Sequence, residues 1–261
     1  MKLAANLSLL YPGLDLPARM QAAARDGFEG VEILFPYDLP PQALAGLLDR
    51  HGLALVLVNT PPGPHGEKGL AGLPGREADF RAGLQQSLAV CRATGCRAIH
   101  VMAGFPREGD ARDACLRTLA TNLRGAAPLA AEEGVTLTLE ALNRQDMPGY
   151  LYWLPQQAAE VVREVGHAHV GLQFDLYHCQ KENLPLPATL AEVRGLVRHV
   201  RFAGADGRHE PDLAAPGVAD ALLALAAGGY EGWIGCEYIP AGDTSAGLAW
   251  RMQYQALLAA G

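Results

Sequence analysis

The sequence has no apolar run long enough to cross a membrane and no recognisable export signal. A spanning helix needs roughly 18–20 apolar residues, and no run here approaches that length. The first residues, MKLAANLSLLYPG, show neither the long apolar core nor the cleavage pattern of a secretory signal. These absences predict a cytoplasmic protein with no membrane partner.

Cysteine is scarce, with five residues in an odd set that has no C-x-x-C spacing. A disulfide framework or a thiolate zinc site normally shows paired cysteines at short, regular spacings. The sequence therefore predicts reduced and mostly buried thiols. Cys179 directly follows His178, but we expect it to fill space rather than to act as a nucleophile. The cysteines are Cys91, Cys96, Cys115, Cys179 and Cys236.

Positive charge is also in short supply. Lysine and arginine together number 21 against 28 aspartates and glutamates, which gives a formal net charge of −7. Proteins that coat nucleic acids bind the phosphates through a basic face, so we expect no nucleic-acid partner. Apolar residues are abundant instead: 49% of the 261 positions are hydrophobic and 19% are charged, which is enough to bury a large core.

One pattern repeats along the chain: a short β-like run, a loop, and a helical run that often ends at glycine. Eight such units in about 250 residues match a TIM barrel. No low-complexity linker divides the chain, so we expect one (β/α)8 TIM barrel domain over residues 1–261. A doubly wound sheet is the alternative, and it would more often carry a glycine-rich phosphate loop. The expected strands are 3–8, 30–35, 53–59, 97–103, 135–140, 170–175, 199–203 and 232–237.

Alternation within the last four strands predicts which side chains point into the barrel, because successive side chains face opposite sides of a strand. In VTLTLE (135–140), Glu140 lies on the face opposite the three aliphatic residues. The same count turns Asp175, Arg201 and Glu237 inward near the ends of their strands. The C-terminal rim of a TIM barrel is where such enzymes carry out their chemistry.

Three carboxylates are therefore expected at one rim. A single carboxylate at a strand end is often a helix N-cap or an ion-pair partner. Glu140, Asp175 and Glu237 together are harder to explain in this way, since buried like charges destabilise a fold unless a metal, a cation or a shared proton compensates. Glu32, on the side of its strand opposite Val31, Ile33 and Phe35, is not expected to contact a substrate or metal directly.

Seven segments carry a resemblance to a known family: ANLSLLY, GFEGVEILFPYD, GREADFR, LEALNRQDMPGY, QFDLYHCQ, GRHEPD and GYEGWIGCEYIP. They resemble the hydroxypyruvate isomerase family, within the wider xylose-isomerase-like TIM barrels. The resemblance runs from the first expected strand to the last helix. It is most specific after the fifth, sixth and eighth strands.

The resemblance implies a divalent Mg²⁺ or Mn²⁺ ion held by Glu140, Asp175 and Glu237, with no organic cofactor. It also implies that Glu140 and Glu237 act as the catalytic acid and base. His178 of the D-x-Y-H motif and Arg208 of the R-x-E-P motif are implied as substrate-binding residues. Taken alone, His178 is equally compatible with capping a helix, and Arg208 with a solvated loop.

Arg201 departs from the family pattern, since HVRFA stands where the family usually reads HVQIA. The family's amide is a metal ligand, whereas a guanidinium has no lone pair to donate to a metal. The fork of donors instead matches a carboxylate. Arg201 therefore either clamps Asp175 or a glutamate in place of the ion, or holds the carboxylate of a 2-oxo acid. We expect it to turn toward Asp175 or Glu237 and to leave metal binding weak or absent.

Two carboxylates and a cation are the groups that an aldose–ketose-type isomerisation needs. One carboxylate removes a proton next to a carbonyl, the other returns a proton to the neighbouring carbon, and the cation stabilises the enediolate between these steps. Together with this chemistry, the resemblance implies a small anionic substrate, either hydroxypyruvate, converted to tartronate semialdehyde, or a related 2-oxo or 2-hydroxy sugar acid.

Two other classes of function stay open at this stage. One is a non-catalytic or activity-drifted barrel that binds a small carboxylate without metal. The other is a metal-dependent nuclease, which would need additional histidine ligands and a basic face. The sequence leaves the oligomeric state open, and a homo-oligomer is compatible with it.

Overall fold

A closed barrel of eight parallel strands forms the centre of the computed structural model, which describes residues 1–260. Each strand pairs with its neighbours in chain order, and β1 closes the barrel by pairing with β8. All eight expected strands are confirmed, although β2 and β4 are shorter than expected. The strands are β1 (Lys2–Asn6), β2 (Gly30–Glu32), β3 (Ala54–Asn59), β4 (Ala98–His100), β5 (Thr136–Glu140), β6 (Val170–Asp175), β7 (Val197–Phe202) and β8 (Trp233–Cys236).

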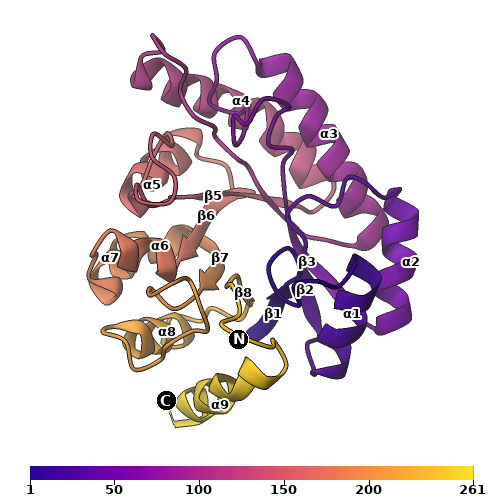
Figure 1. Cartoon of the computed structure of the whole chain (residues 1–261). Helices are drawn as coiled ribbons and strands as arrows, with labels where there is room; N and C mark the ends of the chain where they lie inside the picture. Colours follow the sequence, from indigo (N-terminus) through magenta and orange to yellow (C-terminus); the bar gives the residue numbers. More distant parts are fainter. Residues whose placement is uncertain (261) are drawn as a thin grey trace.

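Helices surround the barrel on its outer side, which makes the fold a (β/α)8 TIM barrel (Figure 1). Glycines in the left-handed conformation end α2, α3 and α5, as the sequence predicts. The helices are α1 (Leu16–Arg25), α2 (Pro41–His51), α3 (Glu77–Thr94), α4 (Arg112–Glu132), α5 (Pro155–Val165), α6 (Leu176–Lys181), α7 (Leu186–Val193), α8 (Val218–Ala227) and α9 (Trp250–Ala260).

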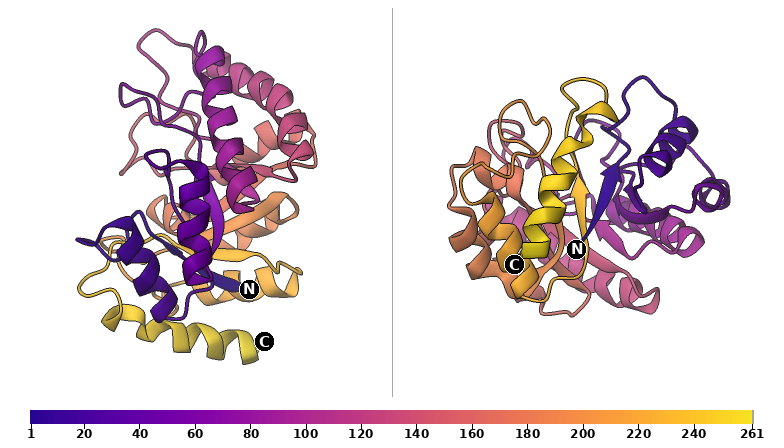
Figure 2. Two further views of the ribbon diagram at one scale, coloured as in Figure 1. Left: turned by 90° about the vertical axis from the view of Figure 1, so that its right-hand side faces the viewer. Right: turned by 90° about the horizontal axis from the view of Figure 1, so that it is seen from below.

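The two ends of the chain meet at the N-terminal end of the barrel. Both views in Figure 2 show α9 beside β1, and the Tyr254 hydroxyl of α9 donates a hydrogen bond of 3.3 Å to the backbone oxygen of Met1. Phe202 at the end of β7 packs on Trp250 and Tyr254, with ring centroids 5.3 and 6.2 Å away. The last helix therefore covers the outer side of the barrel next to its point of closure.

The inside of the barrel changes from apolar to polar along its axis. Near the N-terminal ends of the strands, Ala4, Val56 and Leu57 form an apolar cluster against which Trp233 packs. Farther along, Gly235 of β8 leaves room for a buried carboxylate, because a Cβ atom there would overlap the side chain of Glu32. Gly235 thus makes room for part of the buried polar layer at the C-terminal end of the barrel.

The structure also tests what the sequence predicts about its cysteines and about membrane-spanning helices. All five cysteines are buried and none takes part in a disulfide, which confirms the expectation of free, buried thiols. Between residues 1 and 260, no helix combines the length and the apolar character that a membrane crossing requires.

Candidate active site

The C-terminal ends of the strands enclose a cavity of about 160 Å³. Pockets for drug-sized ligands are usually larger, so this one suits a molecule of a few carbon atoms. Asp175 lies beside the cavity without lining it. The expected site residues that do line it are Glu140, His178, Arg201, Arg208 and Glu237.

A larger cavity of about 360 Å³ opens at the opposite end of the barrel. It lies between the starts of β1 and β8 and helix α9, where Lys2, Trp233 and Tyr254 form part of its wall. TIM barrels carry out their chemistry at the C-terminal ends of the strands, and the buried titratable side chains gather there. The smaller cavity is therefore the candidate site.

Arg201 lies at the centre of the candidate site and is only 1% exposed. Its Nη1 atom lies 3.4 Å from Oε2 of Glu140 and 3.2 Å from Oε1 of Glu237. Burial would lower the pKa of Arg201, but the surrounding glutamates outweigh this effect and raise it. The expected turn toward Glu237 is observed. Of the two partners that the sequence left open, Arg201 pairs with Glu237, and no ion pair in the described chain joins it to Asp175.

Glu32 does not line the cavity, but it is a partner of Arg201 that the sequence analysis did not predict. It is fully buried inside the barrel, where its Oε2 atom accepts hydrogen bonds of 2.9 Å from both Arg201 Nε and Asn6 Nδ2. Its Oε1 atom lies 2.5 Å from Nε2 of His199. Burial alone would raise the pKa of Glu32, but the charge of Arg201 and the contact with His199 outweigh it and lower the pKa. Glu32 thus holds the Arg201 guanidinium in place from inside the barrel.

Glu140, at the end of β5, is only partly compensated. Burial raises its pKa well above the usual value; the charge of Arg201 opposes this rise, and Glu237 and Asp175 add to it. Its Oε2 atom lies 3.4 Å from Nδ1 of His100. Its Oε1 atom has no hydrogen-bond partner among the described residues. A buried carboxylate with a free oxygen is suited to act on a bound molecule.

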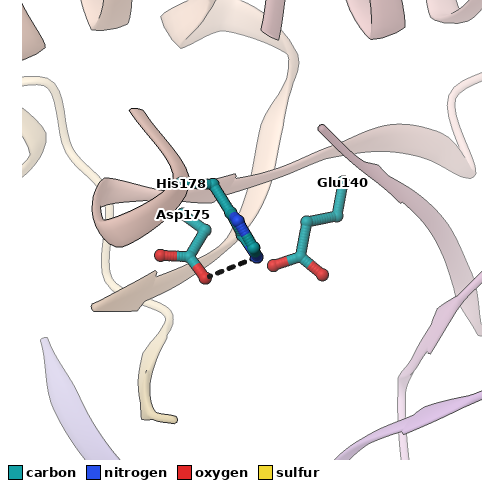
Figure 3. A group of neighbouring side chains, drawn as sticks. All are labelled: Glu140, Asp175 and His178. Carbon is teal, nitrogen blue, oxygen red and sulfur yellow. Dashed lines mark ion pairs between the residues drawn. The ribbon is translucent and has the colours of Figure 1, made fainter. Parts of the chain in front are cut away.

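Asp175 and His178 lie together at the start of α6. Asp175 is the N-cap of this helix, since its Oδ1 atom accepts a hydrogen bond of 2.7 Å from the backbone N–H of Tyr177. His178 lies inside the helix, with Nε2 3.8 Å from Oδ2 of Asp175 (Figure 3). Burial lowers the pKa of His178 to about 3, helped by Arg208, so the ring is neutral. Ligand atoms of Glu140, Asp175 and His178 come within 4.8 Å of one another.

His100 at the end of β4 is a second residue that the sequence analysis missed. It is 1% exposed and lines the cavity beside Glu140. Neither ring nitrogen has a hydrogen-bond partner within residues 1–260. Burial and the nearby charge of Arg201 lower its pKa well below the usual value, so this ring is also neutral.

Arg208 lies in the loop after β7 and closes one side of the cavity. Its Nη2 atom pairs with Oε2 of Glu237, and its guanidinium stacks over the ring of Tyr177 at 4.8 Å from the centroid. The backbone of Arg208 has a φ of 55°, a left-handed conformation that is unusual outside glycine and often found at functional sites. Its backbone oxygen accepts a hydrogen bond of 2.7 Å from the N–H of Ile239. Arg208 is therefore a fixed part of the site and not a solvated loop residue.

Lys68, in the loop between β3 and α3, is a third lining residue that the sequence analysis missed. The residues on either side of it are anchored. Glu67 pairs with Arg76 at 2.6 Å, and Gly69 forms a bridge with Ala103 after β4. The side chain of Lys68 is exposed and makes no ion pair or hydrogen bond with any other described residue. The loop thus holds an uncommitted positive charge at the edge of the cavity.

This geometry agrees with the comparison to known protein families. The family described as Xylose isomerase-like TIM barrel matches residues 20–254. The chain belongs to this family.

Relatives of known name match this xylose isomerase-like chain over nearly its full length. The 2-oxo-tetronate isomerase of Cupriavidus necator is 42% identical over 256 residues, which cover 97% of this chain and 98% of that protein. The hydroxypyruvate isomerase of Escherichia coli is 34% identical over 257 residues, with coverage of 98% and 100%. These matches identify the protein as an isomerase.

A solved structure shows the same xylose isomerase-like fold. The crystal structure described as an AP endonuclease of family 2 from Brucella melitensis superimposes with a TM-score of 0.92 at 40% identity. The superposition covers 97% of this chain and 98% of that one.

Two of the residues that the sequence analysis did not predict point into the barrel for the same reason as the predicted ones, namely alternation along their strands. Counting alternate positions places Glu32 opposite Val31, and the same count places His100 opposite Ile99, so both point into the barrel. The signal was present, but only the inward-facing residues of strands five to eight were taken as candidates for the site. Lys68 lies in a loop without periodicity, and no local pattern could have placed it at the cavity.

Proposed function

We propose that this protein interconverts a small 2-oxo acid and the isomer that carries the carbonyl on the neighbouring carbon, with hydroxypyruvate and 2-oxo-tetronate as the leading substrates. The names of the relatives from Escherichia coli and Cupriavidus necator support this substrate class. The cavity of about 160 Å³ supports it too, since it is small and lined by charged side chains. In this reaction a carbonyl moves between adjacent carbons through an enediolate.

The observation that carries the proposal is the placement of two glutamates around one cation. Glu140 ends β5, and Glu237 directly follows β8. Both face the same Nη1 atom of Arg201, at 3.4 and 3.2 Å. Their two oxygens are therefore no farther apart than the sum of these distances. A three- or four-carbon substrate is long enough to touch both, which is what proton transfer at adjacent carbons requires.

The chain's own groups are suited to each part of the reaction. One glutamate removes a proton from the carbon that bears the hydroxyl group, and the other returns a proton to the neighbouring carbon. His178 and His100 are neutral, so they act as hydrogen-bonding groups that orient the substrate. Glu237 is held by Arg208, which fixes the direction in which its oxygens face. The two glutamates exchange roles when the reaction runs backward.

A carboxylate on the substrate can pair with a positive charge at the cavity that no glutamate or aspartate of the described chain neutralises. Arg201 and Arg208 are both paired with glutamates, so the uncommitted cation at the cavity is Lys68. A charge-assisted hydrogen bond to a substrate carboxylate is roughly twice as strong as a neutral one. The site should therefore turn over hydroxypyruvate and 2-oxo-tetronate in preference to neutral ketoses of similar size. Turnover of the neutral ketoses alone would contradict the proposed substrate class.

Replacement of the paired acids tests the proposed chemistry. Glu140→Gln and Glu237→Gln keep the side-chain shape but cannot transfer protons, so each should lower kcat by about 10²–10⁴-fold. Steady-state rates with the preferred acid measure the effect, and circular dichroism checks the fold. Glu231→Gln, an exposed change just before β8, is the matched control and should keep the parent rate. Parent-like kcat in either active-site variant would show that the acid–base assignment is wrong. Binding of the acids without turnover by the parent would favour the non-catalytic alternative.

A further inference from the structure

The residues at this rim do not fit the divalent ion that the fold family implies. Oε1 of Glu237 lies 3.2 Å from Nη1 of Arg201, and Oε2 pairs with Arg208, so both oxygens already face a permanent positive charge. Glu237 is also outside the one close group of ligand atoms that residues 1–260 contain. An ion on Glu237 would have to displace one guanidinium and remain beside the other.

In the remaining group, Glu140, Asp175 and His178, the histidine nitrogen that an ion would bind, Nε2, carries a proton and has no free lone pair. Nδ1 of His178 accepts a hydrogen bond of 3.1 Å from the backbone N–H of Asn143, and the side-chain Nδ2 of Asn143 lies 2.7 Å from it. The proton of the neutral ring is therefore on Nε2, which faces Asp175 (Figure 3). Binding an ion at Nε2 would move that proton to Nδ1, against two donors of Asn143. Neither set of ligands suits a metal.

Arg201 provides a positive charge at the same place. Its Nε atom donates to Glu32 at 2.9 Å, and Nη1 lies between Glu140 and Glu237. Its Nη2 atom is buried and has no hydrogen-bond partner in the part of the chain that the structure describes. A buried charged donor left without an acceptor destabilises a protein. Because Arg201 lines the cavity, a substrate oxygen can supply the missing acceptor.

We propose that Arg201 takes the place of the metal ion: Nη2 donates hydrogen bonds to the carbonyl oxygen of the substrate and stabilises the enediolate, so that isomerisation needs no metal. This inference rests on the proposed function. Preorganised donors aimed at a developing oxyanion are often the largest single contribution to catalysis. Glu32 and the two catalytic glutamates hold the guanidinium in position before the substrate arrives.

The reaction balances without a co-reactant. One glutamate takes a proton from the hydroxyl-bearing carbon, and the electrons of the broken C–H bond form the carbon–carbon double bond. The carbonyl π electrons move to the oxygen that Arg201 binds, and that oxygen becomes the oxyanion. A proton then bonds to the former carbonyl carbon while the hydroxyl proton passes to the oxyanion, which leaves a carbonyl on the first carbon. Arg201 keeps all its protons.

Metal dependence of the unmodified protein is the first test. Protein freed of metal with EDTA is assayed on hydroxypyruvate and 2-oxo-tetronate with EDTA, Mg²⁺ or Mn²⁺, and is titrated calorimetrically with each ion. We expect equal rates in all three conditions and no heat of ion binding. Loss of turnover in EDTA that either ion restores would overturn the inference, and so would tight binding of an ion. If neither acid is turned over, the proposed function fails, and the titration alone still decides between a metal-free and a metal-binding site.

Replacement of Arg201 is the second test. Arg201→Gln should lower kcat by about 10²–10³-fold, the usual effect of losing an oxyanion donor, with a much smaller change in KM. Arg198→Gln, on the exposed side of the same strand, is the matched control and should change neither. A double variant with Glu32→Gln removes the charge that Arg201→Gln leaves unpaired, and it should show the same loss in kcat in a folded protein. Parent-like kcat in either variant would overturn the inference.

Discussion

The role of each charged side chain at this site is decided by its partners. Arg201 and Arg208 are committed to glutamates, whereas Lys68 has an anchored backbone and no partner within the described chain. Lysine occurs only three times in the sequence, at Lys2, Lys68 and Lys181. A single uncommitted lysine at the cavity is thus a distinctive feature, and it can be tested one residue at a time.

Lys68→Met should weaken substrate binding while leaving the chemical step intact. Loss of a charge-assisted hydrogen bond of about 1.5–3 kcal/mol corresponds to roughly a 10–100-fold rise in KM for the anionic substrate. We expect kcat to change little, because Lys68 is not among the proton-transfer groups. Lys68→Arg keeps the charge and should retain most of the affinity. A fall in kcat with an unchanged KM would contradict this role.

Reductive methylation followed by mass spectrometry gives a measurement that does not depend on turnover. A saturating non-reacting carboxylate of similar size should protect Lys68 from modification. Lys2, at the opposite end of the barrel, and Lys181 are internal controls within the same sample and should be modified at the same rate with or without the ligand. Modification of Lys68 at the same rate with and without the ligand would show that the carboxylate binds elsewhere.

The sequence predicts the direction of a site side chain where that side chain lies on a strand with a regular alternation. Alternation within β5 to β8 turned Glu140, Asp175, Arg201 and Glu237 inward, and the structure has all four at one rim. Alternation does not say which inward side chains meet. Arg201 reaches Glu32, which is 169 positions away in sequence, because the closed barrel brings the interiors of β2 and β7 together. Partner choice depends on strand register, which no local pattern specifies.

The loop between β3 and α3 shows how an element outside the periodic pattern is positioned. Glu67 accepts hydrogen bonds from Arg76 at 2.6 Å and from the backbone N–H of His65 at 2.7 Å. Its own backbone oxygen accepts a hydrogen bond of 2.9 Å from Phe105. These contacts tie the loop to the segment after β4. They arise from tertiary structure, which is why the sequence predicted the strands but not the position of this loop.

Glu67→Gln should destabilise the protein in a pH-dependent way. Burial would raise the pKa of Glu67, but hydrogen bonds from Arg76 and the backbone outweigh it and lower the pKa from 4.5 to about 2. A carboxylate with a lowered pKa stabilises the fold above its unfolded pKa and loses this effect as the pH falls through its folded pKa. We expect the variant to lose about 1.5–3 kcal/mol at pH 7, and the difference from the parent to shrink as the pH falls from 4.5 toward 2.

Denaturant unfolding of parent and Glu67→Gln across this pH range measures the difference. Asp79→Asn is the matched control, because Asp79 pairs with the same arginine at 2.6 Å but is 57% exposed. An exposed ion pair contributes little, so this variant should stay close to the parent at every pH. A constant difference between parent and Glu67→Gln from pH 7 to pH 3 would contradict the assigned role of the carboxylate.

At the scale of the whole molecule, the polar layer inside the barrel joins strands that are far apart in the sequence. Glu32 of β2 contacts Asn6 of β1 and both His199 and Arg201 of β7. Arg201 in turn reaches β5 and β8 through Glu140 and Glu237. The same cluster that presents the guanidinium to the substrate therefore also crosses the barrel interior. Its loss should affect global stability and not only activity.

Glu32→Gln should lower the free energy of unfolding by about 3–5 kcal/mol, because breaking a buried ion pair leaves an uncompensated charge in the interior. Glu29→Gln, three residues earlier, is the matched control: Glu29 pairs with Lys2 at 2.5 Å, but both side chains are exposed, and surface pairs stabilise little. Urea unfolding of the two variants and the parent gives the comparison. If the deficit comes from the unpaired guanidinium, combining Glu32→Gln with Arg201→Met should recover part of it, a coupling that a double-mutant cycle detects. Additive losses would show that Glu32 stabilises the barrel through Asn6 and His199 instead of through Arg201.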